Sequence, residues 1–147
     1  MSYIHKNLTK SEHVVKAAKV HWSIFLPSII FILLGVYLFT MNPLFMVIGA
    51  LLVATSFVHL IKRLFYFIST EAAVTNKRTL AKTGLIQISS IDVQHDKSDA
   101  IRLKQGFMDR IFGSGTLILS STSGTLTPLY GICDPFEFKK TINSLAD

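Results

Sequence analysis

A run of uncharged residues extends from Val20 to Ile61, and it limits the folds open to this chain more than any other feature. The run is interrupted only around Asn42-Pro43, where proline disfavours a helical conformation at the preceding residue. Each half, residues 22–40 and residues 44–61, is close in length to the helix that crosses the roughly 30 Å hydrocarbon core of a bilayer. The sequence therefore predicts a hairpin of two transmembrane helices.

Small residues and uniform hydrophobicity support this prediction. Gly35 in the first span and Gly49 in the second would let the two helices approach closely. Pro27 is expected inside the first span, where a neighbouring helix can satisfy the carbonyl that proline leaves free. Neither span has a polar face, which disfavours a hairpin buried in a soluble core, and no cleavage site follows the first span, which disfavours a signal peptide.

Basic residues flank the uncharged run. Residues 1–63 carry six Lys/Arg and one acid, a net charge of +5, whereas residues 64–147 carry nine Lys/Arg and eight acids, a net charge of +1. The positive-inside rule then places both termini in the cytosol. Because the folded remainder is almost neutral, we expect no nucleic-acid partner. The side chains predicted to lie at the membrane interface are Lys19, His21, Trp22, His59, Lys62 and Arg63.

After residue 63 the chain changes to short segments rich in β-formers and separated by turn residues. Leu64–Val74 is predicted to leave the membrane as the first strand, followed by a turn over residues 75–78. Phe107, Ile111 and Phe112 are expected to pack inward on a short helical turn between glycines. The other predicted strands cover residues 79–83, 85–88, 91–93, 100–105, 116–120 and 125–131, with polar turns at 95–99 and 121–124.

A C-terminal helix is predicted over residues 135–146. Asp134 is placed to cap the helix, Pro135 follows at its first position, and Glu137 completes the capping pattern. Phe138 and Ile142 fall on one face, as in an amphipathic helix that covers a sheet. The sequence thus divides into residues 1–63, an N-terminal lead with the hairpin, and residues 64–147, a small β-domain with one terminal helix.

Two motifs at fitting positions resemble a known family, the bacterial membrane proteins with a pleckstrin-homology-like (PH-like) domain of the second bacterial type. Residues 74–78 (VTNKR) are similar to the family's L-T-x-x-R turn, with Gly84 closing that hairpin. Residues 110–116 (RIFGSGT) are similar to its R-hydrophobic-hydrophobic-G-x-G-T segment. Further matching features are Glu12 and Val14 ahead of His21-Trp22, and Asp134-Pro135-Phe136 at the last helix. The section over residues 92–99 is longer and more polar than in many relatives.

The resemblance implies an α+β membrane protein, in which the transmembrane hairpin precedes a small PH-like bent β-sheet or barrel capped by the C-terminal helix. It also implies a multi-pass protein of the bacterial inner (cytoplasmic) membrane, and it does not imply a catalytic reaction.

Residues with catalytic or metal-binding potential do not form a recognisable site. The five histidines show no metal-ligand spacing, and no carboxylate lies within the spans. His21 and His59 are expected at the same edge of the membrane, either as a pair or as headgroup contacts. Cys133 is the only cysteine, so neither an intrachain disulfide nor a thiolate cluster can form. We expect no enzyme activity, no cofactor and no metal.

Basic residues around the first hairpin are the best candidates for binding. Lys77 and Arg78 lie in the predicted turn and Lys82 lies at the end of the following strand, so they could contact anionic headgroups of membrane lipids or remain solvated. We predict a non-enzymatic, membrane-anchored PH-like module that holds a binding or scaffolding surface at the cytosolic face. Membrane lipids, a homo-oligomer or a membrane protein are its expected partners. The alternative is an accessory subunit of a transporter or of an envelope-stress membrane complex.

Overall fold

The computed structural model describes residues 4, 6–84, 89–94, 101–120, 124 and 126–146. The chain forms two compact units: a hairpin unit, Ile24–Ile68, and a sheet unit, which combines Met1–Ser23 with Ser69–Asp147. This grouping differs from the predicted division at residue 63. The residues before the hairpin belong with the sheet unit because they supply one of its strands.

The hairpin unit consists of two long apolar helices. A short 3-10 turn, η1 (Trp22–Phe25), precedes α2 (Leu26–Met41), and α3 extends over Pro43–Ser69. The helical segments Trp22–Met41, which joins η1 to α2, and Pro43–Ser69 are long and apolar enough to cross a membrane: their most apolar windows have a mean hydropathy of 2.4, and only 11% of each window is buried. Pro27 lies in the first turn of α2, where its missing N–H removes no helical hydrogen bond. Pro27 thus lies inside the first span, Trp22–Met41, as expected, and near the start of its α-helix.

Asn42 connects the two helices. Its side-chain Oδ1 accepts a hydrogen bond from the backbone N of Leu44 at 2.8 Å, and its carbonyl accepts one from Phe45 at 3.0 Å. Asn42 therefore caps α3, and Pro43 follows at the first helical position, where proline is favoured.

The close approach at Gly35 and Gly49 is confirmed. Both glycines are buried, and a Cβ added to Gly49 would lie 2.6 Å from the carbonyl oxygen of Gly35. Only hydrogen fits at this crossing, since the obstructing atoms are backbone atoms that cannot move independently. At the other end of the hairpin, Arg63 donates a hydrogen bond to the backbone carbonyl of Ile24.

The predicted strand over Leu64–Val74 was wrong in its first half. α3 continues through Ser69, and β2 begins only at Glu71. Aromatic and β-branched residues cost a helix only a few tenths of a kcal/mol each, so an existing helix propagates through residues 64–69 despite their β-preference.

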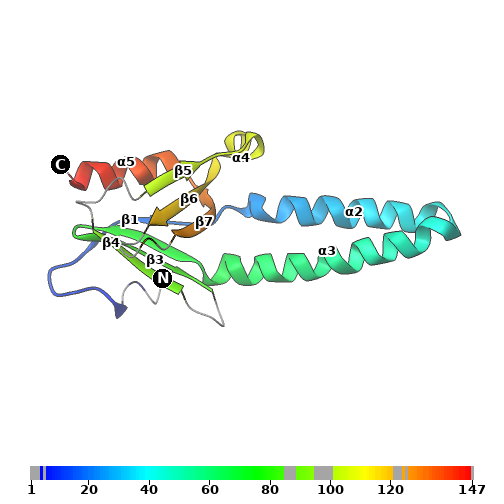
Figure 1. Cartoon of the computed structure of the whole chain (residues 1–147), viewed down its shortest axis with the longest axis horizontal. Helices are drawn as coiled ribbons and strands as arrows, with labels where there is room; N and C mark the ends of the chain where they lie inside the picture. Colours follow the sequence, from blue (N-terminus) through cyan, green and yellow to red (C-terminus); the bar gives the residue numbers. More distant parts are fainter. Residues whose placement is uncertain are drawn as a thin grey trace. The chain divides into compact units, whose positions relative to one another are not determined.

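Over the residues that the structure describes, the sheet unit contains two open antiparallel sheets (Figure 1). The first has the order β1 (Val14–Ala18), β2 (Glu71–Thr75), β3 (Arg78–Thr83) and β4 (Ser89–Gln94). Strand β1 was not predicted, because VVKAA is too short and too mixed to be recognised as a strand. It pairs with β2, with Ala17 opposite Ala73 and Ala18 opposite Ala72.

The second sheet has the order β5 (Ile101–Lys104), β6 (Ser114–Ser120) and β7 (Leu126–Cys133), and α4 (Phe107–Phe112) connects β5 to β6. Alternation along β6 buries Leu117 and Leu119 completely, as expected for a half-buried strand. The predicted strand at residues 85–88 and the turn at 95–99 lie outside the described residues, as does most of the turn at 121–124.

The C-terminal helix α5 (Pro135–Ala146) agrees with the prediction. It contacts β1 and β2 of the first sheet and β5 and β6 of the second. Phe138 and Ile142, the two residues assigned to its apolar face, are each only 1% exposed. The helix therefore joins the two sheets into one core, which also contains Leu117, Leu119, Leu129 and Ile132.

Phe107 and Ile111 do not pack inward as predicted. They are 78% and 61% exposed, and of the three residues assigned to that turn only Phe112 is partly covered. The helix is six residues long and presents most of its apolar side chains outward.

Candidate functional site

The turn between β2 and β3 is built around Thr75. Only Asn76 and Lys77 separate the two strands. The Thr75 hydroxyl accepts hydrogen bonds from the backbone N of Lys77 at 3.3 Å and of Arg78 at 3.1 Å. A buried hydroxyl at this position therefore satisfies the backbone donors of the turn, which is the local reason for threonine at this place in the motif.

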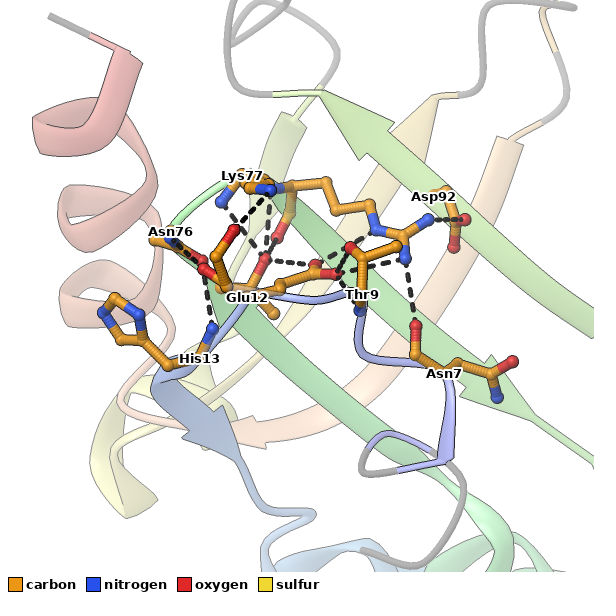
Figure 2. Close-up of polar contacts among 10 residues, drawn as sticks. Asn7, Thr9, Glu12, His13, Asn76, Lys77 and Asp92 are labelled. Carbon is orange, nitrogen blue, oxygen red and sulfur yellow. Dashed lines mark hydrogen bonds and ion pairs between the residues drawn. The ribbon is translucent and has the colours of Figure 1, made fainter.

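Asn76 ties this turn to the N-terminal segment. Its Oδ1 accepts from the backbone N of His13 at 3.1 Å, and its Nδ2 donates to the carbonyl of Ser11 at 3.1 Å. The backbone N of Asn76 also donates to the carbonyl of His13 at 3.2 Å. These contacts extend the pairing of β1 with β2 beyond the end of the strands (Figure 2).

Arg78 and Glu12 form a buried ion pair beside the turn. Arg78 donates from Nε to Glu12 Oε1 at 3.1 Å and from Nη2 to Glu12 Oε2 at 3.3 Å. The Glu12 side chain is completely buried, whereas that of Arg78 is 26% exposed. The remaining guanidinium donors reach the carbonyl of Asn7 at 3.1 Å and the carboxylate of Asp92, on β4, at 2.7 Å (Figure 2).

Threonine hydroxyls complete the shell around the buried carboxylate. Glu12 Oε1 lies 2.8 Å from Thr75 Oγ1, and Glu12 Oε2 accepts from the backbone N and the hydroxyl of Thr9. The Arg78 guanidinium is the main cause that holds the pKa of Glu12 far below its usual range, against the opposing effect of burial. The same hydrogen bonds raise the pKa of Arg78. Both groups are therefore charged at neutral pH.

We call Glu12, Thr75 and Arg78, with the capping Thr9 and Asp92, the Glu12–Arg78 cluster. The cluster has a structural role. Each carboxylate oxygen of Glu12 accepts hydrogen bonds from more than one donor, and the Arg78 guanidinium donates to Glu12, Asp92 and Asn7. The sequence offered one signal for it, since Glu12 is the single acid in the basic stretch before residue 64. The partner of Glu12 could not be inferred, because it lies 66 residues away in the chain.

The three predicted headgroup residues have different surroundings. The contacts of Arg78 favour a role inside the fold. Lys77 is exposed, and its Nζ donates to the hydroxyl of Ser11 at 3.1 Å. Lys82 is half-buried on β3, in register with Glu71 on β2, so that opposite charges face each other across the strands. Lys77 is thus the most accessible cation of the three.

The predicted interface residues fall into both units. In the sheet unit, Lys19 and Trp22 are exposed, and His21 Nδ1 lies 2.9 Å from the hydroxyl of Ser23. In the hairpin unit, His59 and Lys62 are exposed on α3, and Arg63 contacts Ile24 as described above. Within the described residues, no group of three His, Cys, Asp or Glu side chains could hold a metal ion.

Comparison with protein-family models shows to which family this protein belongs. The family model for the bacterial PH domain matches residues 23–146, which is most of the chain. This protein belongs to the bacterial PH domain family. Neither the curated proteins nor the solved structures gave a match.

Membership in this family suggests a non-enzymatic binding module. PH-like domains are binding modules that generally lack catalytic activity, and nothing in the Glu12–Arg78 cluster resembles an activated nucleophile. The matched segment begins after Glu12. The family's T-x-x-R turn in this chain is therefore completed by a residue from outside the matched segment, which β1 brings into place.

Proposed function

We propose that this protein is a membrane-anchored, non-enzymatic PH-like module, which holds a binding or scaffolding surface at the cytosolic face of a bacterial inner membrane. The observation that carries the proposal is the exposure of α2 and α3, whose most apolar windows are only 11% buried. An apolar surface of this extent would cause aggregation in water, whereas lipid solvates it at no cost.

The connections between the two units support anchoring of the sheet unit at the membrane surface. One residue, Thr70, separates α3 from β2, and seven residues separate β1 from α2. Strands β1 and β2 are hydrogen-bonded neighbours, so the chain enters and leaves the hairpin from adjacent strands. The Glu12–Arg78 cluster fastens these strands together. The sheet unit therefore has two short tethers and stays within reach of headgroups.

Lys77 is the proposed headgroup contact. A lysine near an anionic membrane surface contributes about 1 kcal/mol to binding. Lys77 is exposed on a turn whose backbone is fixed by Thr75 and Asn76, so binding has to order its side chain but not the backbone of the turn. Lys82 is a secondary candidate at the far end of β3.

Membrane topology can be tested with single cysteines in the full chain. In a Cys133→Ser background, Met41→Cys reports on the α2–α3 connection and Asn143→Cys reports on α5; both positions are exposed. We expect a membrane-impermeant maleimide to label residue 41 in intact spheroplasts and residue 143 only after lysis. Labelling of both positions from the same side, or extraction of the chain from membranes by carbonate, would refute the proposed anchoring.

Headgroup contact requires a separate test. The full chain is reconstituted in vesicles of phosphatidylcholine and phosphatidylglycerol that contain a trace of photoactivatable phosphatidylglycerol. We expect Lys77→Gln to reduce cross-linking to the segment around β2 and β3, whereas Lys140→Gln, an exposed lysine on α5, leaves it unchanged. Equal cross-linking in both variants would remove the lipid contact and leave the anchoring intact. Arg78 is unsuitable for this test because its loss would disturb the fold.

The accessory-subunit alternative would be favoured by small residues on a lipid-facing stripe of the helices. Gly35 and Gly49 do not form such a stripe, because both are buried against the opposite helix of the hairpin. Purification in mild detergent distinguishes the two functions, since a stoichiometric second protein would favour the alternative.

A further inference from the structure

The short helix α4 presents an apolar surface formed by Phe107, Met108 and Ile111. These side chains are 78%, 65% and 61% exposed. Residues 107 and 111 are four apart and residues 108 and 111 three apart, so the three side chains can share one side of the helix. We call this group the α4 apolar surface. Three neighbouring large apolar side chains at such exposure indicate a contact with something other than water.

Two contacts attach α4 to the residues where the first span begins. The ring of Phe112, the last residue of α4, meets the ring of Trp22 edge-on, with 5.7 Å between centroids. The hydroxyl of Ser114 lies 3.2 Å from that of Ser23. Trp22 is the first residue of the span and Ser23 is the second. The end of α4 and the residue after it therefore contact the first two residues of the span.

The segment before Trp22 is itself fixed to the sheet unit. It lies antiparallel to the end of β7: the backbone N of Cys133 donates to Lys19 at 2.9 Å, and the backbone N of His21 donates to Gly131 at 2.6 Å. Val20 and Ile132 form the bridge between these two bonds. Because the chain is held up to His21, the position of Trp22 beside α4 does not depend on the orientation of the hairpin unit.

Internal hydrogen bonds keep the acidic residue of α4 away from the apolar surface. Asp109 accepts from the backbone N of Gly106 at 3.2 Å and from the hydroxyl of Ser114 at 3.2 Å. Its neighbour Arg110 is exposed. The outward side of α4 thus combines large apolar side chains with a cation, the composition of a segment that lies in the headgroup layer.

We propose that α4 is an interfacial membrane contact, which inserts Phe107, Met108 and Ile111 into the boundary between headgroups and acyl chains. A six-residue helix is only about 9 Å long, so the whole surface lies within reach of the interface at which Trp22 enters the bilayer. The proposal rests on the proposed membrane anchoring. It adds a lipid-binding site to the family's second motif, separate from the basic turn at Lys77.

The test uses the full chain in vesicles with spin-labelled lipids that quench fluorescence at shallow or deep positions. In the Cys133→Ser background, an environment-sensitive fluorophore is attached at Met108→Cys on α4, at Leu33→Cys in the first span, or at Leu126→Cys. Leu126 is a matched control because it is also apolar and is 58% exposed. It is the first residue of β7, and about 23 Å of strand separate it from Cys133, the last residue of β7.

We expect shallow quenchers to act on residue 108, deep quenchers to act on residue 33, and neither to act on residue 126. Trp22, the only tryptophan, should be quenched at the same depth as residue 108 without any label. The substitutions Phe107→Ser and Ile111→Ser together should remove most of the quenching at residue 108 and leave that of Trp22 unchanged.

The controls separate the possible failures. Quenching at residue 33 without quenching at residue 108 would overturn the α4 contact and leave the anchoring intact. Absence of quenching at residue 33 would overturn the anchoring itself. A third outcome is a label at residue 108 whose emission is blue-shifted but not quenched by either lipid quencher. If this blue shift disappears when the protein is diluted with lipid, a second copy of the chain covers α4, and the proposal is overturned.

Discussion

Removal of the Arg78 charge should destabilise the sheet unit and change its response to pH. In Arg78→Met the stem of the side chain is retained, but the buried carboxylate of Glu12 keeps only the donors of Thr9 and Thr75. Breaking a buried ion pair by removing one partner typically costs about 3–5 kcal/mol. Because 26% of the Arg78 side chain is exposed and water can replace part of the guanidinium, we expect about 2–3 kcal/mol.

Urea unfolding of the full chain in mild detergent measures this loss. Trp22 reports on the sheet unit through its contact with Phe112 and is the only tryptophan. With an m-value of about 1.5 kcal/mol/M, the midpoint should decrease by roughly 2 M. Glu12→Gln removes the buried charge, so the double variant Glu12→Gln with Arg78→Met should lose less stability than the sum of the two single variants.

The direction of the pH effect follows from the lowered pKa of Glu12. In the wild type the folded pKa is below the ordinary value of 4.5, so the contribution of this group is complete above that pH and is lost as pH falls through the folded pKa. In Arg78→Met the largest cause of this lowering is lost, and only the hydrogen bonds of Thr9 and Thr75 oppose the effect of burial, so the pKa of Glu12 moves up toward its ordinary value. The stability difference between the two proteins should therefore shrink below about pH 4.5. A constant difference from neutral to acid pH, or additive effects in the double variant, would refute the ion-pair explanation.

Three further outcomes are expected. Gly49→Leu should destabilise the hairpin by about 1–3 kcal/mol in mixed detergent–SDS unfolding, because its Cβ meets backbone atoms at 2.6 Å, whereas Ala50→Leu on the exposed side should be nearly neutral. Asn76→Ala should increase hydrogen exchange at residues 11–13 by removing about 1 kcal/mol of side-chain hydrogen bonding, and unchanged exchange would contradict the assigned contacts. Burial raises the pKa of the Cys133 thiol, so its rate of alkylation should still be rising above pH 9.0; a plateau below that value would exclude the raised pKa.

The candidate site was only partly predictable from the sequence. The turn at residues 75–78 and its basic side chains were recognised from local composition and from the family motif. The assignment of Arg78 to the surface followed from its place in a turn, but a guanidinium in a turn is exposed only if no carboxylate reaches it. Glu12 reaches it because β1 pairs with β2, and this pairing leaves no periodic signal in a five-residue strand.

The α4 apolar surface shows a similar limit. Large apolar residues between two glycines are normally assigned to a core, because burial in the fold is their commonest means of leaving water. Here Asp109 and Ser114 fix the helix in the opposite orientation: Phe112 packs against Trp22, whereas Phe107, Met108 and Ile111 are mostly exposed. The hydrophobicity of a residue predicts that it is shielded from water. It does not predict whether protein or lipid provides the shielding.

The sequence alone determined the two apolar helices, the proline-marked turn between them, most of the strands and the amphipathic C-terminal helix. These features depend on hydrophobic periodicity and on backbone preferences of single residues, which act over a few positions. The tertiary structure decided the pairing of β1 with β2, the continuation of α3 through Ser69 and the burial of Glu12 against Arg78. Each depends on contacts between distant segments, whose free energy exceeds the small local preferences that the sequence displays.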